Sequence, residues 1–189
     1  MRVIWLSVVV CCIAMLLGSV LLPTFDPLIS ADNFIGQIAK VRQEHPDSIV
    51  VSSFNIRIDR EERNPDNHFS LRVHRMANFL ARSQLDFVGT QEAYGGQMEH
   101  LLREVNMRQS TVFRAVESDV GDAMYKARTA IIYNADRFEL IERAHQWLSE
   151  TPSVPSASWG SKGIRTATTG VFRRIGTNAT VSFARFLCS

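Results

Sequence analysis

The N-terminal run of residues 3–22 most constrains how this chain can fold, because it reads VIWLSVVVCCIAMLLGSVLL and contains no charged residue. As a helix, such a run spans roughly 30 Å, the thickness of the hydrocarbon core of a bilayer. Arg2 precedes it, which favours a signal anchor with a cytoplasmic N-terminus. The alternative is a cleaved signal peptide, for which Ser30-Ala31 offers a late cleavage site. We therefore expect residues 1–23 to form a hydrophobic helix that takes the chain into the secretory route, anchored in a membrane or secreted.

The rest of the chain, roughly 165 residues, is long enough for one domain with its own core. Residues 24–47 read as a linker followed by a spacer helix, because Phe34, Ile38 and Val41 recur at helical spacing. Asn178 lies in the sequence Asn-Ala-Thr and is a candidate glycosylation site, which is compatible with the secretory route.

Charge and cysteine content exclude several classes of protein. The chain has 21 Lys and Arg against 19 Asp and Glu, a net charge of +2, which gives no electrostatic case for a dedicated nucleic-acid binder. Of the three cysteines, Cys11 and Cys12 are adjacent in the apolar run and only Cys188 remains. Neither an internal disulfide framework nor a zinc site is therefore expected.

Strands and helices alternate through the middle of the chain. Two helices are expected, one that begins at a capping Ser70 and one over residues 97–105. The segments expected as strands are short and rich in β-branched or apolar residues, and they are residues 48–58 (ending near Asn55), 85–90, 111–116, 128–133 and 138–141. Helices early and hairpins later predict an α/β sandwich of packed sheets with flanking helices.

Four segments carry a resemblance to a known family. They read VVSSFNIRID, FSLRVHRMANFLARSQLDFVGTQEA, ARTAIIYNADRFELIE and HQWLSETPSVPSASWGSKGIRTAT, in that order. Together they resemble the endonuclease/exonuclease/phosphatase superfamily, in the subgroup described as metal-dependent hydrolases, over about residues 48–172. The resemblance implies a four-layer α/β sandwich, with two sheets face to face and helices outside. It also implies cleavage of phosphate esters with Mg²⁺ or Mn²⁺.

The resemblance implies two residues of a metal site. Glu92, in GTQEA, matches the family's metal-binding glutamate, and Asn55, in SFNIR, matches an asparagine that helps to hold the metal and the phosphate oxygens. Hard cations prefer such oxygen ligands. Without the resemblance, Glu92 would read as a surface glutamate at a strand end and Asn55 as a residue that favours a turn. The two converge if their strands are neighbours in one sheet.

Three further residues are candidates for binding the substrate. Arg57 follows Asn55 at strand spacing, so both side chains are expected at the same edge of the sheet, where a guanidinium suits a phosphate. A salt bridge at the rim is the alternative. Trp159 and Arg165 lie in SASWGSKGIRTAT, which matches a segment near the family's substrate cleft. Trp159 could stack on a base, a sugar or a lipid head group, or be packed against the domain.

The C-terminal segment departs from the family's pattern. After the strand ATVSF the family continues into an NTHLDH-like motif that supplies the general-base histidine and more aspartates, whereas this chain reads ARFLCS. We therefore expect residues 48–183 to be a partial domain and residues 184–189 a divergent tail. Such a chain is expected to lack hydrolysis of its own and to expose open strand edges and apolar surface.

Two functions follow from these expectations. The first is a divalent-metal-dependent phosphoesterase, truncated and inactive as this chain, acting on a nucleic acid, a phosphoinositide, a sphingolipid or a nucleotide-like molecule. The small net charge disfavours long nucleic acids. The alternative is a non-catalytic binding protein with the same fold, tethered to a membrane or secreted.

Overall fold

The computed structural model describes residues 3–5, 31–94, 96–117 and 129–186. The helices are α1 (Ala31–Glu44), α2 (Phe69–Arg82) and α3 (Gln97–Asn106), with a 3-10 turn η1 (Pro65–Asn67). The strands are β1 (Val3–Trp5), β2 (Ile49–Asn55), β3 (Phe87–Gln91), β4 (Phe113–Val116), β5 (Thr129–Asn134), β6 (Phe138–Trp147), β7 (Thr166–Arg174) and β8 (Thr180–Phe186). These elements confirm the expected mixed α/β architecture.

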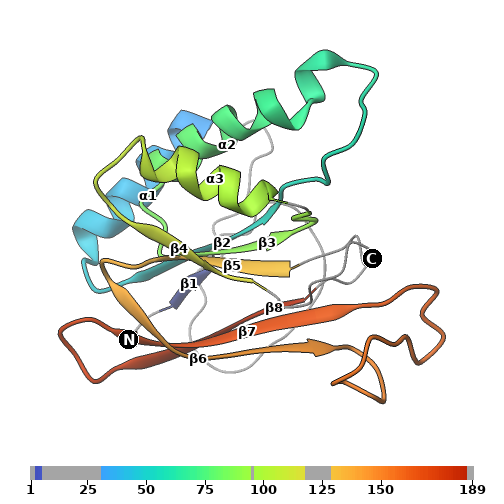
Figure 1. Ribbon diagram of the computed structural model, residues 1–189. Coiled ribbons are helices and arrows are strands. Elements are labelled where there is room, and N and C mark those ends of the chain that lie inside the picture. Colours follow the sequence, from blue (N-terminus) through green and yellow to red (C-terminus); the bar gives the residue numbers. More distant parts are fainter. Residues whose placement is uncertain (1–2, 6–30, 95, 118–128, 187–189) are drawn as a thin grey trace.

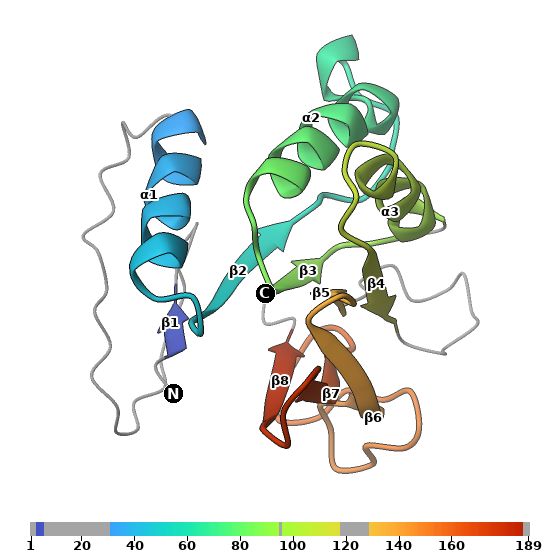
Figure 2. The same ribbon diagram turned by 90° about the vertical axis from the view of Figure 1, so that its left-hand side faces the viewer.

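Two sheets form the body of the domain. One has five strands in the order β1-β2-β3-β5-β4, in which β1, β2 and β3 are parallel and β5 is antiparallel to both of its neighbours. The other is the antiparallel sheet β6-β7-β8. Figures 1 and 2 show the three helices on one face of the larger sheet and the smaller sheet on the opposite face. The described residues thus form three of the four expected layers.

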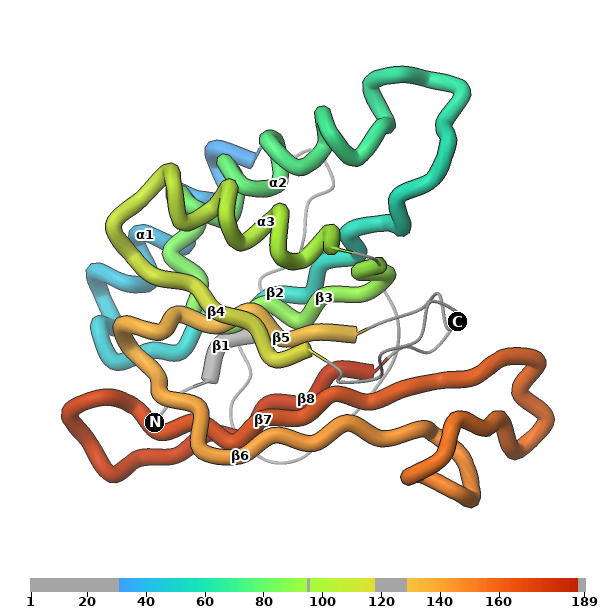
Figure 3. Tube along the Cα trace, in the orientation of Figure 1, coloured from blue at the N-terminus to red at the C-terminus, as the bar shows by residue number. Residues whose placement is uncertain are grey.

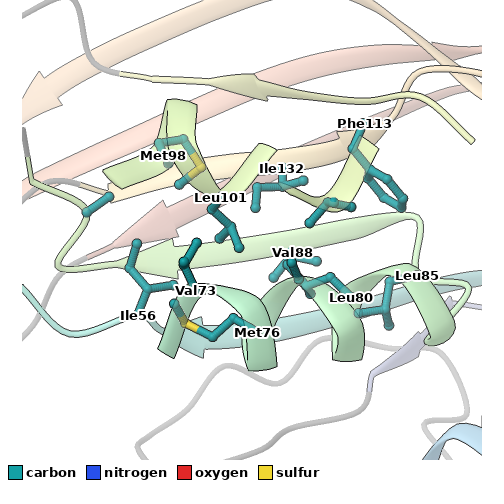
Figure 4. Packing of buried hydrophobic residues seen from close by; sticks show 14 of the residues in the cluster. Ile56, Val73, Met76, Leu80, Leu85, Val88, Met98, Leu101, Phe113 and Ile132 are labelled. Atoms are coloured by element: carbon teal, nitrogen blue, oxygen red, sulfur yellow. The ribbon is translucent and has the colours of Figure 1, made fainter. Parts of the chain in front are cut away.

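The central strands are apolar on both faces, because each face is covered. Val50 of β2 and Val88 of β3 belong to the cluster under the helices, together with Leu80 of α2 and Leu101 of α3 (Figure 4). Their sequence neighbours point the other way, and Phe87 packs between the two sheets. A strand covered on both faces reads as a continuous apolar run, which explains why the β2 segment alternates so poorly.

Gly89 allows the two sheets to approach each other closely in the middle of β3. A Cβ atom at this position would lie 2.7 Å from Arg185 Cδ and 3.3 Å from Phe183 Cε1, both on β8. The side chains of β8 therefore occupy the space that a larger residue at Gly89 would need.

Several expected boundaries shift in the structure. Helix α2 begins at Phe69, and its N-cap is His68, not Ser70, because η1 delivers the chain to His68 in an extended conformation. Strand β6 continues to Trp147, well past residue 141. The sequence prediction ended too early because the exposed polar residues of this strand hide its pattern. Strand β8 runs to Phe186, beyond position 183.

The N-terminal run differs from expectation where it is described. Val3–Trp5 forms strand β1, parallel to β2, with Val3 opposite Ile49. β-Branched residues favour a strand, and pairing here satisfies the backbone groups along the edge of β2. The remainder of the expected hydrophobic helix, residues 6–22, lies outside the described residues. Within the described part of the chain, no helix combines the length and the apolar character needed to cross a membrane.

Candidate functional site

Asn55 and Glu92 meet where two adjacent parallel strands end. In the register of β2 and β3, Asn55 lies opposite Gln91, so the residue after Gln91 projects beyond the sheet beside Asn55. Asn55 Nδ2 donates a hydrogen bond to Glu92 Oε1 at 2.8 Å. Asn55 is exposed and Glu92 is half-buried, so both remain accessible from solvent. The structure therefore brings together the two residues that the sequence suggested as a pair.

Backbone amides fix the orientation of both side chains. Asn55 Oδ1 accepts a hydrogen bond from Arg57 N at 2.8 Å, which turns its NH₂ group toward Glu92. Glu92 Oε2 accepts a longer hydrogen bond, 3.4 Å, from Ile58 N. The last residue of β2 thus contacts one oxygen of the carboxylate, and the segment after β2 contacts the other.

The backbone is strained at this site. Arg57 and Glu92 have φ angles of 57° and 58°, in the left-handed region that non-glycine residues seldom occupy. Such a conformation costs about 1–3 kcal/mol and persists only where surrounding contacts enforce it. Both strands therefore end at enforced bends, and these bends set the positions of Asn55 and Glu92.

Arg72 of α2 stabilises the bend at Arg57 through hydrogen bonds to backbone carbonyl groups. Its guanidinium donates to the carbonyl oxygens of Ile56 at 2.6 Å, Arg57 at 3.2 Å and Asn67 at 2.6 Å. Burial is the main cause that lowers the pKa of Arg72 below its ordinary value, and the neighbouring Arg57 lowers it further. Figure 3 traces the long segment between β2 and α2 that this arginine anchors.

Arg57 does not lie on the strand, contrary to the expected spacing. Strand β2 ends at Asn55, and the left-handed φ at Arg57 removes the alternation that would place both side chains on one face. The Arg57 guanidinium instead contacts Glu62, with Nη2 2.7 Å from Oε1. The structure thus has the salt bridge that was the alternative to a phosphate contact.

Trp159 and Arg165 belong to the connection between β6 and β7. Figure 1 shows that β3 and β6 run toward the same end of the molecule, so this connection lies at the end where Asn55 and Glu92 meet. Trp159 is 71% exposed, so its side chain is not packed against the described residues, and its φ is 54°. Arg165 Nη1 donates to Ile164 O at 3.2 Å. Asn178 is exposed in the turn between β7 and β8.

A polar group between the sheets, in which Thr129 and Thr168 are fully buried, was not predicted from the sequence. Thr129 starts β5 opposite Gln91, and its Oγ1 lies 2.8 Å from Thr168 Oγ1 of β7. His145 Nδ1 of β6 lies 3.1 Å from the same Thr168 oxygen. No motif connects these three residues in the sequence. They meet because both sheets contribute strand ends here.

A shallow recess of about 280 Å³ lies beside the segment after β2. Phe69 of α2 and His100 of α3 line it, with Asp59 and Gln97 on the side of the candidate site. No pattern in the sequence indicates this recess, because its residues come from two helices and a loop.

His74 and His100 are not independent surface residues. His74 Nδ1 lies 2.9 Å from Glu104 Oε2, and His100 Nε2 lies 3.7 Å from Glu104 Oε1. A hydrogen bond from Arg108 is the main cause that holds the pKa of Glu104 below its ordinary value, although burial opposes it. This cluster joins α2 to α3 and includes neither Asn55 nor Glu92.

Comparisons with known proteins agree on the fold. No family model and no curated protein matches this sequence. An endonuclease/exonuclease/phosphatase family protein from Bacteroides thetaiotaomicron has a TM-score of 0.62 and 25% identity, over 72% of this chain and 49% of its own. The corresponding protein from Bacteroides vulgatus has a TM-score of 0.62 and 25% identity, over 71% and 50%. A mannosyl-6-phosphatase from Bacteroides thetaiotaomicron has a TM-score of 0.59 and 26% identity, over 72% and 50%. The chain spans about half the length of these proteins.

Proposed function

We propose that this chain, which has the fold of the endonuclease/exonuclease/phosphatase superfamily, provides the metal-binding edge of a divalent-metal-dependent phosphoesterase. The observation that carries the proposal is the 2.8 Å hydrogen bond between Asn55 and Glu92, an amide and a carboxylate at the ends of two parallel strands. The substrate is a phosphate ester. A net charge of +2 argues for a small ester or a lipid rather than a long nucleic acid.

The side chains at this edge fit Mg²⁺ or Mn²⁺. Such ions are commonly bound through one or two carboxylates, with waters and substrate phosphates completing the coordination. The hydrogen bonds from Asn55 and Ile58 use two of the about four acceptor positions of the Glu92 carboxylate. Among the described residues, no group of three or more His, Cys, Asp or Glu is arranged to hold an ion. In this proposal Glu92 is the carboxylate ligand among the described residues, and water or substrate oxygens take other positions.

Each residue of the chain has a distinct part in this proposal. The Glu92 carboxylate would hold the ion, and Asn55 would orient that carboxylate and donate its NH₂ group to a phosphate oxygen. A bound ion neutralises charge on the phosphate and lowers the pKa of a water that it binds. Trp159 and Arg165 would contact the rest of the substrate, because their loop lies at the same end of the molecule.

Replacing Glu92 tests the proposal directly. We expect Glu92→Gln to weaken Mn²⁺ binding by about 100-fold, because the substitution keeps the shape of the side chain but removes the charged oxygen ligand. A titration of the 189-residue chain with Mn²⁺, followed by electron paramagnetic resonance, measures the change. Turnover of a simple phosphodiester in Mn²⁺ is followed in parallel.

Glu44→Gln is the matched control, since Glu44 is an exposed glutamate at the end of α1 with a 3.8 Å contact to Lys40. It should bind Mn²⁺ as the unchanged chain does. Equal binding by the Glu92→Gln variant would contradict the proposal.

A non-catalytic binding protein is the second candidate function. The same Asn55–Glu92 pair would serve it, by holding an ion or a phosphate without turnover. Mn²⁺ binding that depends on Glu92, with no turnover by this chain, is the result that this candidate predicts. Binding with turnover supports the phosphoesterase and would refute the expectation that the 189-residue chain is inactive.

We also propose that the chain enters the secretory route, because residues 3–22 carry no charge and Asn178 lies in an exposed turn. Expression in a eukaryotic cell should give a glycosylated chain. Its electrophoretic mobility should increase after endoglycosidase treatment, and the Asn178→Gln variant should migrate at this higher mobility without treatment. A chain recovered unglycosylated from the cytosol would refute this location.

A further inference from the structure

Gln97 is a polar residue with a fully buried side chain. It is the first residue of α3, and only 2% of it is exposed. Every polar group of its side-chain amide has a partner. Oε1 accepts hydrogen bonds from Asp59 N and Tyr94 N, both at 3.0 Å, and Nε2 donates to Arg57 O at 3.0 Å. A buried amide is retained at low energetic cost only when it is satisfied in this way.

The partners of Gln97 come from the two segments that carry the candidate site. Arg57 and Asp59 belong to the segment after β2, and they flank Ile58, whose N–H donates to Glu92. Tyr94 belongs to the segment after β3, two residues beyond Glu92. The Gln97 side chain therefore connects the segment after β2 to the segment after β3.

The strained backbone gives this bridge a specific task. Arg57 and Glu92 both have left-handed φ angles, which relax unless neighbouring contacts enforce them. The bond to Arg57 O lies directly on one bend, and the bond to Tyr94 N lies two residues beyond the other bend, at Glu92. Arg72 adds a contact to Arg57 O from α2, whereas Gln97 contacts both Arg57 O and Tyr94 N and so links the segments that carry the two bends.

We propose that Gln97 is a positioning residue that holds the Asn55–Glu92 pair in the geometry needed to bind a divalent ion. The inference rests on the function proposed above. Gln97 itself contacts neither ion nor substrate, since its amide is occupied by backbone groups. A site of this kind requires its side chains to be held within about 0.5 Å of their working positions.

The test compares Gln97→Leu with Asn106→Leu. Asn106 is a matched control because it lies on the same helix and its amide also bonds to backbone, to Phe113 N at 2.8 Å and Phe113 O at 3.0 Å. Both substitutions remove backbone hydrogen bonds and should lower the melting temperature. Only Gln97→Leu should weaken Mn²⁺ binding, by about tenfold, as the loss of a supporting contact does at metal sites.

Hydrogen–deuterium exchange gives a readout that needs no metal. In Gln97→Leu we expect faster exchange in residues 55–59 and 92–94, and in Asn106→Leu no change in either segment. If the unchanged chain does not bind Mn²⁺, the proposed function fails, while the exchange data still decide the role of Gln97. Exchange in both segments equal to that of the Asn106→Leu variant would overturn the proposal.

Gln97→Glu covers the case in which the leucine variant does not fold. The substitution keeps acceptors for Asp59 N and Tyr94 N but loses the donor to Arg57 O. We expect exchange to rise in residues 55–59 and to remain unchanged in residues 92–94. Unchanged exchange in both segments would also overturn the proposal.

Discussion

Asp86→Ala is expected to lower the free energy of unfolding by about 3–5 kcal/mol, because it removes one partner of a buried ion-pair network. The Asp86 carboxylate is fully buried at the start of β3. Its Oδ2 accepts from Val50 N at 2.8 Å and contacts Arg42, and its Oδ1 lies 2.5 Å from Arg137 Nη1. Burial is the main cause that lowers the pKa of Arg137, and Asp86 is the attraction that opposes it. Without Asp86, two guanidinium groups would face each other around an empty buried position.

Urea unfolding of the 189-residue chain, followed by tryptophan fluorescence, measures this effect. Asp32→Ala is the matched control, because Asp32 also pairs with an arginine, Arg82 at 2.7 Å, but its side chain is 73% exposed. Exposed pairs contribute about 0–1 kcal/mol, so the control should unfold at nearly the same urea concentration as the unchanged chain. Equal losses in the two variants would show that the buried network contributes no more than a surface pair.

The sequence alone does not reveal this network. In LDFVGT, Asp86 reads as an ordinary polar residue before a strand. Its partners come from α1, from β2 and from the turn after β5, far from it in sequence. A charged residue that is buried by distant segments carries no periodic signal, so only the folded chain identifies it.

The order of the elements could be predicted, because it follows from local patterns. The apolar face of α2 and the apolar run of β3 both contact the core as expected. The pairing of Asn55 with Glu92 was also predictable, since parallel neighbouring strands bring their C-terminal ends together. The roles of Asn55 and Glu92 remain predictions.

The bends at that edge could not be predicted. A left-handed φ at Arg57 or Glu92 is enforced by tertiary contacts, and neither residue type favours it. The expected strand spacing therefore failed at Arg57, whose guanidinium pairs with Glu62. Gln97 was missed for a related reason, because a glutamine at the start of a helix is ordinarily exposed.

Phe87→Ala is expected to have an effect of similar size, about 3–5 kcal/mol, on the free energy of unfolding. Phe87 of β3 is fully buried between the sheets. Its ring centroid lies 4.7 Å from that of Phe138, 4.8 Å from Phe172 and 5.5 Å from Phe183, one on each strand of the smaller sheet. Alanine would leave a cavity where three rings meet. Gly89, two residues further along β3, has no side chain to fill the space.

Urea unfolding again provides the measurement, with Phe186→Ala as the matched control. Phe186 lies on β8 and is 47% exposed, so its truncation should cost no more than about 1 kcal/mol, in proportion to the smaller buried area. If the two sheets pack as the structure places them, Phe87→Ala should also weaken the protection of β7 and β8 amides against hydrogen exchange, while the helices retain theirs. A loss no larger than that of the control would mean that the smaller sheet is stable without its contact to β3.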